Sequence, residues 1–252
     1  MRHLSAKKWL FLFALLLIVF SGYHGITSVN RGANAGSAQA GNPRLTYILP
    51  PPNTTGNVSV EEALANRRSR RRFQNRELSK EQLSQILWAA YGITEPRRGA
   101  SLRGGLRTTP SAGALFPLEI YVVVGNVAGI EPGVYKYISQ EHKIIRTIDR
   151  DVRRELSAAA LDQVMVRDAP ITLVHTAVFR RITDRYGERG RERYVFMEVG
   201  HSAQNVYLQA EALGLGTCAI GAFRDSRVSA LLQLPADHEP LYLMPVGYFV
   251  PR

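Results

Sequence analysis

The chain of 252 residues contains, near its middle, the segment Pro110-Ser111-Ala112-Gly113-Ala114-Leu115-Phe116-Pro117-Leu118-Glu119-Ile120-Tyr121. Small residues between two prolines predict a stiff turn with little side-chain bulk. A flat ligand could lie close to the backbone of such a turn, with Ser111 and exposed N–H groups as donors. The next run, Leu118–Val124, is rich in β-forming residues and predicts a strand. An ordinary loop leading into a strand has the same pattern, so the turn alone does not identify a site.

Helices and further strands are predicted on both sides of this strand. The clearest helix begins after Ser79, where Gln82 at the third helical position completes a capping box, and it ends at Gly92. The other elements do not alternate regularly between helix and strand, which favours an α+β fold. They are helices at residues 59–67, 151–161, 192–213 and 225–232, a Gly/Arg-rich loop at residues 95–108, and strands at residues 133–137, 142–148, 171–178 and 241–246.

Five arginines lie within the six residues of Arg67-Arg68-Ser69-Arg70-Arg71-Arg72. Guanidinium groups this close repel one another, and their planar two-donor forks beside a short hydroxyl suit a phosphate. A solvated basic face is an alternative interpretation. A nucleic-acid surface is a third, but no aromatic platform and no nucleic-acid motif accompanies the arginines.

A polar segment lies within the predicted long helix, where Glu198 and Asn205 share one face. His201 has no second ligand four positions later, so a structural histidine is favoured over a metal ligand. The Gly-rich stretch at residues 213–221 allows close approach of the backbone to a ligand. Cys218 is the only cysteine, which excludes an intramolecular disulfide and a multi-cysteine metal site, and we interpret it as a small buried hydrophobe.

The net charge of +11 is concentrated in the first part of the chain. Residues 1–60 carry five basic groups and no acid, residues 61–107 carry eleven basic and five acidic groups, and residues 108–252 carry 16 of each. A basic surface spread over the whole fold is therefore excluded. Outside Arg67–Arg72, four arginines are candidate contacts for an acidic substrate or a membrane surface: Arg97, Arg98, Arg103 and Arg107.

Residues 1–40 are predicted to be a signal peptide or an N-terminal membrane anchor. Three basic residues precede an uncharged apolar run at residues 9–20, which is shorter than a spanning helix needs and fits an export signal. Cleavage near Ala38-Gln39-Ala40 and retention as an anchor are both open, and a buried core helix is a third reading. The basic N-terminus favours a domain outside the cytoplasm, although a cytoplasmic location stays open. Residues 41–57 are predicted to be a flexible linker and residues 58–252 the folded domain.

The arginine segment, the turn and the helix segment, in this order, resemble the FMN-dependent nitroreductase family. The nearer match is its branch of SagB-type, azoline-dehydrogenase-like oxidases. The resemblance extends over residues 58–248 and is strongest at Pro110–Tyr121, Arg185–Gly190 and Glu198–Asn205. It implies an α+β, domain-intertwined homodimer, with a mainly antiparallel central sheet flanked by helices and FMN at the subunit interface. The substrate would be a small molecule or a peptide, and NAD(P)H is a candidate electron donor.

The resemblance also implies which residues hold the cofactor. The motif that binds the flavin phosphate and ribityl chain matches Arg67, Ser69, Arg71 and, through its backbone, Arg68. The loop that lies along the isoalloxazine ring, contributed by the opposite subunit, matches Pro110, Ser111, Ala112 and Gly113. The segment beside the reducing face of the ring matches Ala219, Ile220 and Gly221.

One position departs from the family pattern. Active azoline dehydrogenases typically have a lysine immediately before the tyrosine that corresponds to Tyr186, whereas this chain has Arg185. Arginine stays protonated at any working pH, so Arg185 cannot act as an ordinary base. Tyr186, assisted by the charge of Arg185, is therefore the candidate catalytic residue. A surface salt bridge from Arg185 to Glu188 or Asp184 is the alternative interpretation.

Three functions follow from these patterns. The first is an FMN-dependent oxidoreductase of unknown substrate, and the second is a non-catalytic flavin-binding module on the same fold, which Arg185 keeps open. The third is a basic membrane- or nucleic-acid-binding protein. The zero net charge of residues 108–252 counts against the third, so no nucleic-acid partner and no metal site are predicted.

Overall fold

A computed structural model describes residues 45–97 and 103–251 of the chain. Its main sheet has seven strands in the order β1-β6-β5-β4-β7-β9-β8, and every neighbouring pair is antiparallel. A second, two-stranded sheet pairs β2 with β3. The strands are β1 (Thr46–Ile48), β2 (Ile93–Pro96), β3 (Gly105–Arg107), β4 (Leu118–Val124), β5 (Gly133–Ile138), β6 (Lys143–Ile148), β7 (Ile171–Ala177), β8 (Gly216–Thr217) and β9 (Glu239–Gly247).

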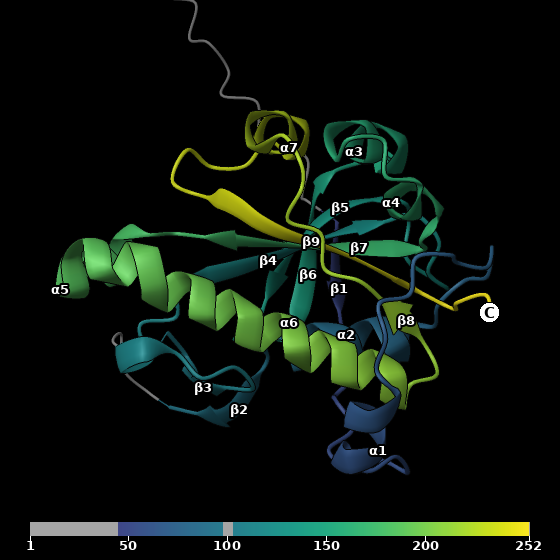
Figure 1. The fold of residues 1–252 in the computed structure, drawn as a ribbon, viewed down its shortest axis with the longest axis horizontal. Coiled ribbons are helices and arrows are strands. Elements are labelled where there is room, and N and C mark those ends of the chain that lie inside the picture. Colours follow the sequence, from purple (N-terminus) through teal and green to yellow (C-terminus); the bar gives the residue numbers. More distant parts are fainter. Residues whose placement is uncertain (1–44, 98–102, 252) are drawn as a thin grey trace, which may run out of the picture. The chain divides into compact units, whose positions relative to one another are not determined.

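Helices cover both faces of the main sheet (Figure 1), with α2 and α6 on one face and α3, α4 and α7 on the other. The alternation of strand side chains explains why both faces are apolar. On β4, Ile120 and Val122 belong to one buried cluster, whereas Tyr121 and Val123 belong to the other. The predicted α+β fold with an antiparallel sheet is confirmed. The helices are α1 (Val60–Asn66), α2 (Lys80–Tyr91), α3 (Arg153–Ala159), α4 (Val164–Asp168), α5 (Arg180–Arg189), α6 (Val195–Ala212) and α7 (Asp225–Leu232).

Helix α2 forms as its sequence predicts. The Ser79 hydroxyl accepts a hydrogen bond from the Gln82 N–H at 3.2 Å, and the Gln82 side-chain oxygen accepts one from the Ser79 N–H at 3.0 Å. These bonds satisfy two N–H groups that a helix end would otherwise leave unpaired. The helix ends at Gly92, whose N–H donates to the Trp88 carbonyl.

The helix that carries most of the site is longer than predicted. A π-helical turn, η3 (Gly190–Tyr194), joins α5 to α6, so that helical backbone runs from residue 180 to residue 212. Gly187 interrupts it with a φ of 56° and a ψ of −151°, which an L-residue with a side chain adopts only under strain. The sequence did not predict α5 because Ile182 is its only buried residue, so the apolar periodicity is absent.

Three other expectations need correction. The range 41–57 is not wholly a flexible linker, because β1 pairs with β6 and Leu49 is buried in the core. The loop predicted at residues 95–108 contributes to the β2–β3 hairpin. Asp225 does not cap α7, because the cap position is Arg224 and no side-chain cap bond forms.

Two sequence predictions fall outside the part that the structure describes. These are the signal or anchor at residues 1–40, including the apolar run 9–20, and the position of Arg98. Within residues 45–97 and 103–251, no helix combines the length and apolar character needed to cross a bilayer.

Candidate functional site

The arginine segment lies along the short edge strand β8. Ser69 forms a parallel bridge with Thr217, and the Arg70 N–H donates to the Thr217 carbonyl at 2.9 Å. The contact needs a glycine beside it, because a Cβ on Gly216 would lie 2.6 Å from the Cβ of Arg70. Segments some 150 positions apart in sequence are thereby joined, which brings the predicted phosphate motif beside the predicted ring-contact segment.

Tyr207 on α6 holds this junction together. Its hydroxyl lies 3.0 Å from the Ser69 hydroxyl and accepts a hydrogen bond from the Ala219 N–H at 2.8 Å. The Arg67 guanidinium lies 5.3 Å from the centroid of the Tyr207 ring. Three of the predicted cofactor residues therefore meet at one tyrosine. Sequence reasoning missed Tyr207, since its role depends on two segments that are distant in sequence.

A cavity of about 140 Å³ opens beside this junction and is lined by Arg68, Ser69, Arg70, Arg71, Arg72 and Val250. Within the described residues, none of its arginines forms an ion pair with a carboxylate. Their contacts are to neutral groups instead, such as the Arg70 guanidinium over the Phe249 ring at 4.3 Å.

Two buried polar atoms at this junction lack a hydrogen-bond partner, the Arg70 Nε and the Thr217 Oγ1. A group of cations without counter-charge, beside unsatisfied donors, suits an oxyanion that accepts several hydrogen bonds. A phosphate monoester therefore fits the residues at this position, as the terminal group of FMN requires.

Residues 219–221 continue from β8 toward β9. Ile220 is buried and exchanges backbone hydrogen bonds with Leu243 at 2.9 and 3.0 Å, so its position is fixed by the sheet. Gly221, the next residue, is exposed to solvent. All three predicted ring-contact residues thus lie on the Tyr207 side of the site.

The predicted flavin loop, Pro110–Gly113, lies against the predicted catalytic pair. A Cβ added to Gly113 would lie 2.7 Å from the Tyr186 hydroxyl oxygen and 3.2 Å from a terminal nitrogen of Arg185. Gly113 also has a φ of 61°, which favours glycine. Ser111 shapes the loop from within, because its hydroxyl accepts a hydrogen bond from the Phe116 N–H at 2.9 Å.

Arg185 and Tyr186 contact each other. The Arg185 guanidinium lies 5.3 Å from the centroid of the Tyr186 ring, and that ring packs edge-on against Tyr194 with centroids 5.1 Å apart. Arg185 makes no salt bridge to Glu188 or Asp184. The proposed surface ion pair of Arg185 is therefore not formed, and its charge stays beside Tyr186.

Glu198 is a buried carboxyl behind the same loop. It is 1% exposed, its Oε1 accepts a hydrogen bond from the Tyr91 hydroxyl at 2.5 Å, and its Oε2 has no hydrogen-bond partner. Burial raises the pKa of Glu198 to about 7, although the Ser111 and Tyr91 hydroxyls and the charge of Arg107 act in the opposite direction. A carboxyl in this state can hold or release a proton near neutral pH.

A cavity of about 250 Å³ connects Glu198 with the loop, and it is lined by Pro110, Ser111, Ala112, Tyr194, Met197, Glu198 and His201. Sequence analysis placed Glu198 on a helix face without assigning it a role. A carboxylate among the apolar residues of α6 was the available signal. His201 is exposed at the rim of this cavity rather than a buried structural histidine.

Cys218 is buried, and burial raises the pKa of its thiol to about 11, in agreement with its interpretation as a small hydrophobe. The described residues contain no group of three or more His, Cys, Asp or Glu side chains placed to hold a metal ion.

Within the described residues, the cavity beside the arginine segment and the cavity beside the 110–112 loop have no lining residue in common. Glu198 lies beside the loop and Tyr207 beside the arginine segment, nine positions apart on α6. At 1.5 Å per residue this separation is about 13 Å along the helix.

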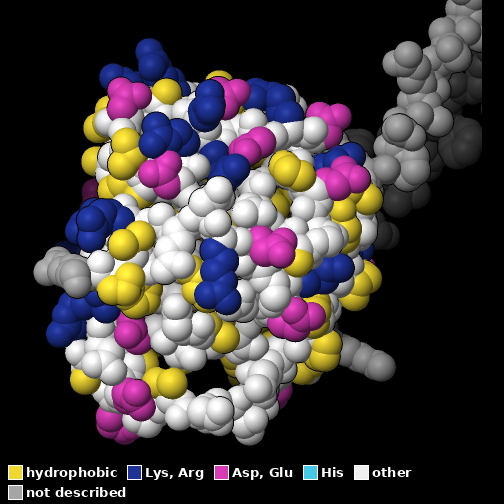
Figure 2. Space-filling view, turned by 90° about the vertical axis from the view of Figure 1, so that its right-hand side faces the viewer, with side chains coloured by type: hydrophobic (Ala, Val, Ile, Leu, Met, Phe, Trp, Pro, Cys, Tyr) yellow, Lys and Arg dark blue, Asp and Glu magenta, His cyan; other side chains and the backbone are white. Residues whose placement is uncertain are grey.

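Charged side chains of both signs are interspersed on the face drawn in Figure 2, where no continuous basic surface is formed by the described residues.

Comparisons with known proteins agree with this geometry. A sequence model of the nitroreductase family matches residues 64–248. The nitroreductase-like protein MJ1384 of Methanocaldococcus jannaschii is 50% identical over 190 residues, which cover 75% of this chain and 91% of that protein. A crystal structure from Ralstonia eutropha, described as a nitroreductase, has a TM-score of 0.68 and 28% identity, and the match covers 82% of this chain and 90% of the other.

Two more distant relatives have named activities. The microcin B17-processing protein McbC of Escherichia coli is 29% identical over 164 residues, covering 62% of this chain and 57% of that protein. The FMN reductase (NADPH) of Bacillus subtilis is 30% identical over 122 residues, covering 43% of this chain and 49% of that protein.

Proposed function

Because the chain belongs to the nitroreductase family, we propose that it is an oxidoreductase that uses FMN. The observation that carries the proposal is the junction at Tyr207, where Arg67, Ser69 and Ala219 converge beside a cavity lined by unpaired arginines. The relative named as an FMN reductase supports the choice of flavin.

The residues at the junction would hold the two ends of the cofactor. Arg67, Arg68, Ser69 and Arg71 would bind the phosphate and ribityl chain, and residues 219–221 and 110–113 would lie beside the ring. When bound, FMN supplies the ability to accept a hydride and pass electrons onward.

The chain itself would supply proton handling and charge. Glu198 can hold a proton at its Oε2, which has no hydrogen-bond partner among the described residues. Tyr186 offers a hydroxyl against Gly113, and Arg185 keeps a positive charge beside it. A variant Tyr186→Phe should slow flavin reduction by substrate, and an unchanged rate would remove Tyr186 from the reaction.

We further propose that the active form is a homodimer. A second copy would bring its 110–113 loop to the Tyr207 junction. Apolar side chains at half exposure or more are available for the contact: Val60, Leu64, Phe196 and Met197. Phe196 and Met197 are adjacent in the chain, and exposed apolar side chains that gather in one patch mark an interface. A Met197→Glu variant that stayed dimeric in sedimentation would contradict this surface.

The substrate class divides into two proposals. The relationship to McbC favours a SagB-type dehydrogenase acting on a peptide, whereas Arg185 in place of the family lysine favours another substrate or a non-catalytic flavin-binding module. Peptide oxidation by the purified chain would support the first.

The experiment that tests the core proposal uses the full chain. Purified protein should be yellow and release FMN on denaturation, and a colourless protein that FMN cannot reconstitute would contradict it. Anaerobic bleaching by NADH or NADPH would identify the enzyme and its donor. The extracytoplasmic location predicted from residues 1–40 stays a separate proposal, tested by cell fractionation.

A further inference from the structure

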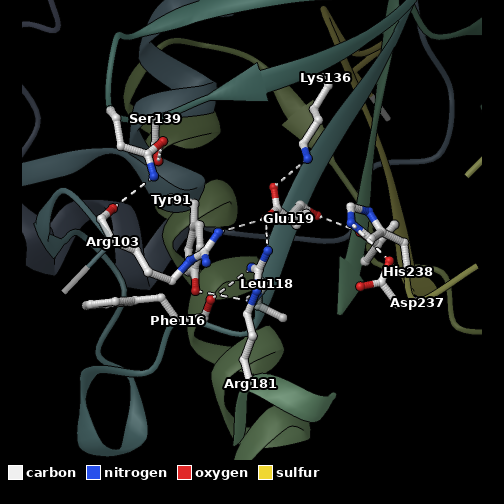
Figure 3. Close-up of polar contacts among 12 residues, drawn as sticks. Tyr91, Arg103, Phe116, Leu118, Glu119, Lys136, Ser139, Arg181, Asp237 and His238 are labelled. Carbon is white, nitrogen blue, oxygen red and sulfur yellow. Dashed lines mark hydrogen bonds and ion pairs between the residues drawn. The ribbon is translucent and has the colours of Figure 1, made fainter. Parts of the chain in front are cut away.

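A third cavity, of about 150 Å³, lies where the β2–β3 hairpin meets β4 and β5. Arg103, Arg107 and Lys136 line it, with Glu119 as the single carboxylate among its lining residues (Figure 3). The sequence marks Arg103 and Arg107 as candidate contacts for an acidic substrate or a membrane surface, without choosing between the two. The structure brings both to this cavity, whereas Arg97 forms an exposed ion pair with Glu95.

Both carboxylate oxygens of Glu119 form ion pairs with cations other than Arg107. Its Oε1 pairs with Arg103 at 3.3 Å and with Arg181 at 2.5 Å, and its Oε2 pairs with Lys136 at 3.1 Å. Its side chain is 12% exposed. Burial opposes ionisation of this carboxyl, but Lys136 and Arg181 outweigh burial and hold its pKa below the ordinary value. Glu119 therefore stays charged, and no free oxygen of it remains for Arg107.

Arg107 has no carboxylate partner among the described residues. Its terminal nitrogens donate only to neutral oxygens. These are the backbone carbonyls of Tyr91 and Arg103, both at 3.2 Å, and the Ser139 hydroxyl at 2.6 Å. Its guanidinium stacks on Tyr91 and Phe116, 4.4 and 4.9 Å from the ring centroids. The charge is thus held in place by neutral groups that do not neutralise it.

Two donors in this region are buried and unused, the Nε–H groups of Arg103 and Arg107. A buried guanidinium donor without an acceptor costs free energy that an anion would recover. Three cations line the cavity with Glu119 as the single carboxylate. Arg181, which also pairs with Glu119, adds a fourth positive charge nearby.

We propose that this cavity binds the carboxylate of a small organic acid. A carboxylate can accept from guanidinium forks in the plane that arginine prefers. A phosphate dianion is disfavoured because it would share the cavity with the charge of Glu119. Leu118, Ile120 and Tyr137 are buried behind the cavity, so its accessible walls are mainly polar and suit an acid with a short carbon skeleton.

The site also lies next to the loop cavity. Tyr91 lines the cation-rich cavity, and its hydroxyl donates to Glu198, which lines the cavity of the 110–112 loop. An acid bound here would be separated from the loop cavity by these two side chains. The binding inference itself does not depend on FMN, so it is tested without flavin chemistry.

The test is a titration of the full chain with propionate at constant ionic strength, in which NMR monitors the arginine Nε–Hε groups. Propionate should shift the signals of Arg103 and Arg107, whereas propionamide, its neutral analogue of similar shape, should not. Equal shifts with both compounds, or no shift with propionate, would overturn the proposal. A response to inorganic phosphate that exceeds the response to propionate would also overturn it, because the ligand class would be wrong.

Variants assign the response to the cavity. Arg107→Lys keeps the charge but removes the fork, and we expect propionate affinity to fall about tenfold or more. Arg97→Gln is the matched control, since it removes an exposed arginine of the same hairpin, and its affinity should equal that of the wild type. If Arg107→Lys does not fold, Arg103→Gln replaces it with the same expectation. Unchanged affinity in the folded variant would contradict the site.

Discussion

The chain holds two groups of arginines that differ in what surrounds them. The segment Arg67–Arg72 faces an open cavity and has no ion pair within the described residues, whereas Arg103 and Arg181 converge on Glu119 inside the fold. The first group has its backbone fixed by β8 and Tyr207, and its charges are left free. The second has most of its charge satisfied internally, with Arg107 as the exception.

The difference separates a binding role from a structural one. Unpaired cations at an open cavity contribute little to folding and are available to a dianion such as a phosphate monoester. Breaking the pairs around a buried carboxylate destabilises the fold, because it leaves partly buried charges that water compensates only in part. The two groups should therefore respond differently to mutation. Variants of the first group should weaken ligand binding without loss of stability, whereas variants that break the ion pairs of Glu119 should lower stability.

The largest effect is expected from Glu119→Gln. This variant leaves Lys136, Arg103 and Arg181 without their shared carboxylate and should lower the free energy of unfolding by about 3–5 kcal/mol. Denaturant unfolding followed by circular dichroism measures it. Glu141→Gln is the control, because it breaks an exposed pair with Lys143 and should cost less than about 1 kcal/mol. A small loss in Glu119→Gln would mean that the cluster is not structural.

A pH dependence should come from Glu198, which lies behind Tyr91 at the edge of the second group. Its folded-state pKa of about 7 is above the ordinary value of 4.5. Its contribution to stability is therefore fully present below pH 4.5 and is lost as pH rises toward about 7. Glu198→Gln removes this dependence while keeping a group that accepts from Tyr91.

The measurement for Glu198 is the difference between the wild-type and variant unfolding curves across this range. The wild-type curve alone is insufficient, because burial lowers the pKa of His175 to about 4 and gives an opposite slope in the same window. A difference that does not change with pH would contradict the assignment of the titrating group to Glu198.

The first group should show its effect in cofactor retention. Arg71→Gln removes a charge-assisted donor worth about 1.5–3 kcal/mol, so FMN affinity should fall by about tenfold to a hundredfold. The unfolding free energy of the FMN-free protein should not change. Equilibrium dialysis with FMN gives the affinity. If Arg71→Gln lowered the free energy of unfolding but not the FMN affinity, the assignment of the first group to ligand binding would be contradicted.

A smaller effect is expected from Tyr207→Phe. This variant removes the hydroxyl that binds the Ser69 side chain and the Ala219 N–H, while keeping the ring beneath Arg67. Two neutral hydrogen bonds worth about 0.5–1.5 kcal/mol each are lost, which should lower the free energy of unfolding by about 1–3 kcal/mol. Because these bonds also fix the positions of Ser69 and Ala219, FMN affinity should fall as well, by at most about tenfold. Tyr248→Phe is a matched control, since that hydroxyl binds Gln82 on α2, and its FMN affinity should be unchanged.

Local sequence patterns predicted the parts of the fold that depend on local interactions. The capping box at Ser79 and the β-forming run at Leu118–Val124 each stabilise their own segment, and both elements form at the predicted positions. The strand β1 and the helix α5 were missed because neither has a continuous apolar pattern. Their positions depend on contacts with β6 and with the rest of the helix.

The site was predicted in part. The motifs identified the arginine segment, the 110–113 loop and Ala219, and the structure joins the first and third at Tyr207. The role of Tyr207 could not be read from spacing, since its contact with Ser69 joins segments 138 positions apart. The pairing of Glu119 with Arg103 spans only 16 positions, but it joins a loop to a strand with no periodic pattern between them. The roles of the site residues stay predictions that the variants above address.

The most direct test of the account compares FMN with riboflavin, which lacks the phosphate. The flavin is removed from the purified full chain, and each compound is titrated back while protein and flavin fluorescence are followed. If the unpaired arginines bind the phosphate, FMN rebinds and riboflavin binds at least about a hundredfold more weakly. Equal affinity for both, or no binding of FMN, would contradict the assignment of Arg67–Arg72 to the cofactor.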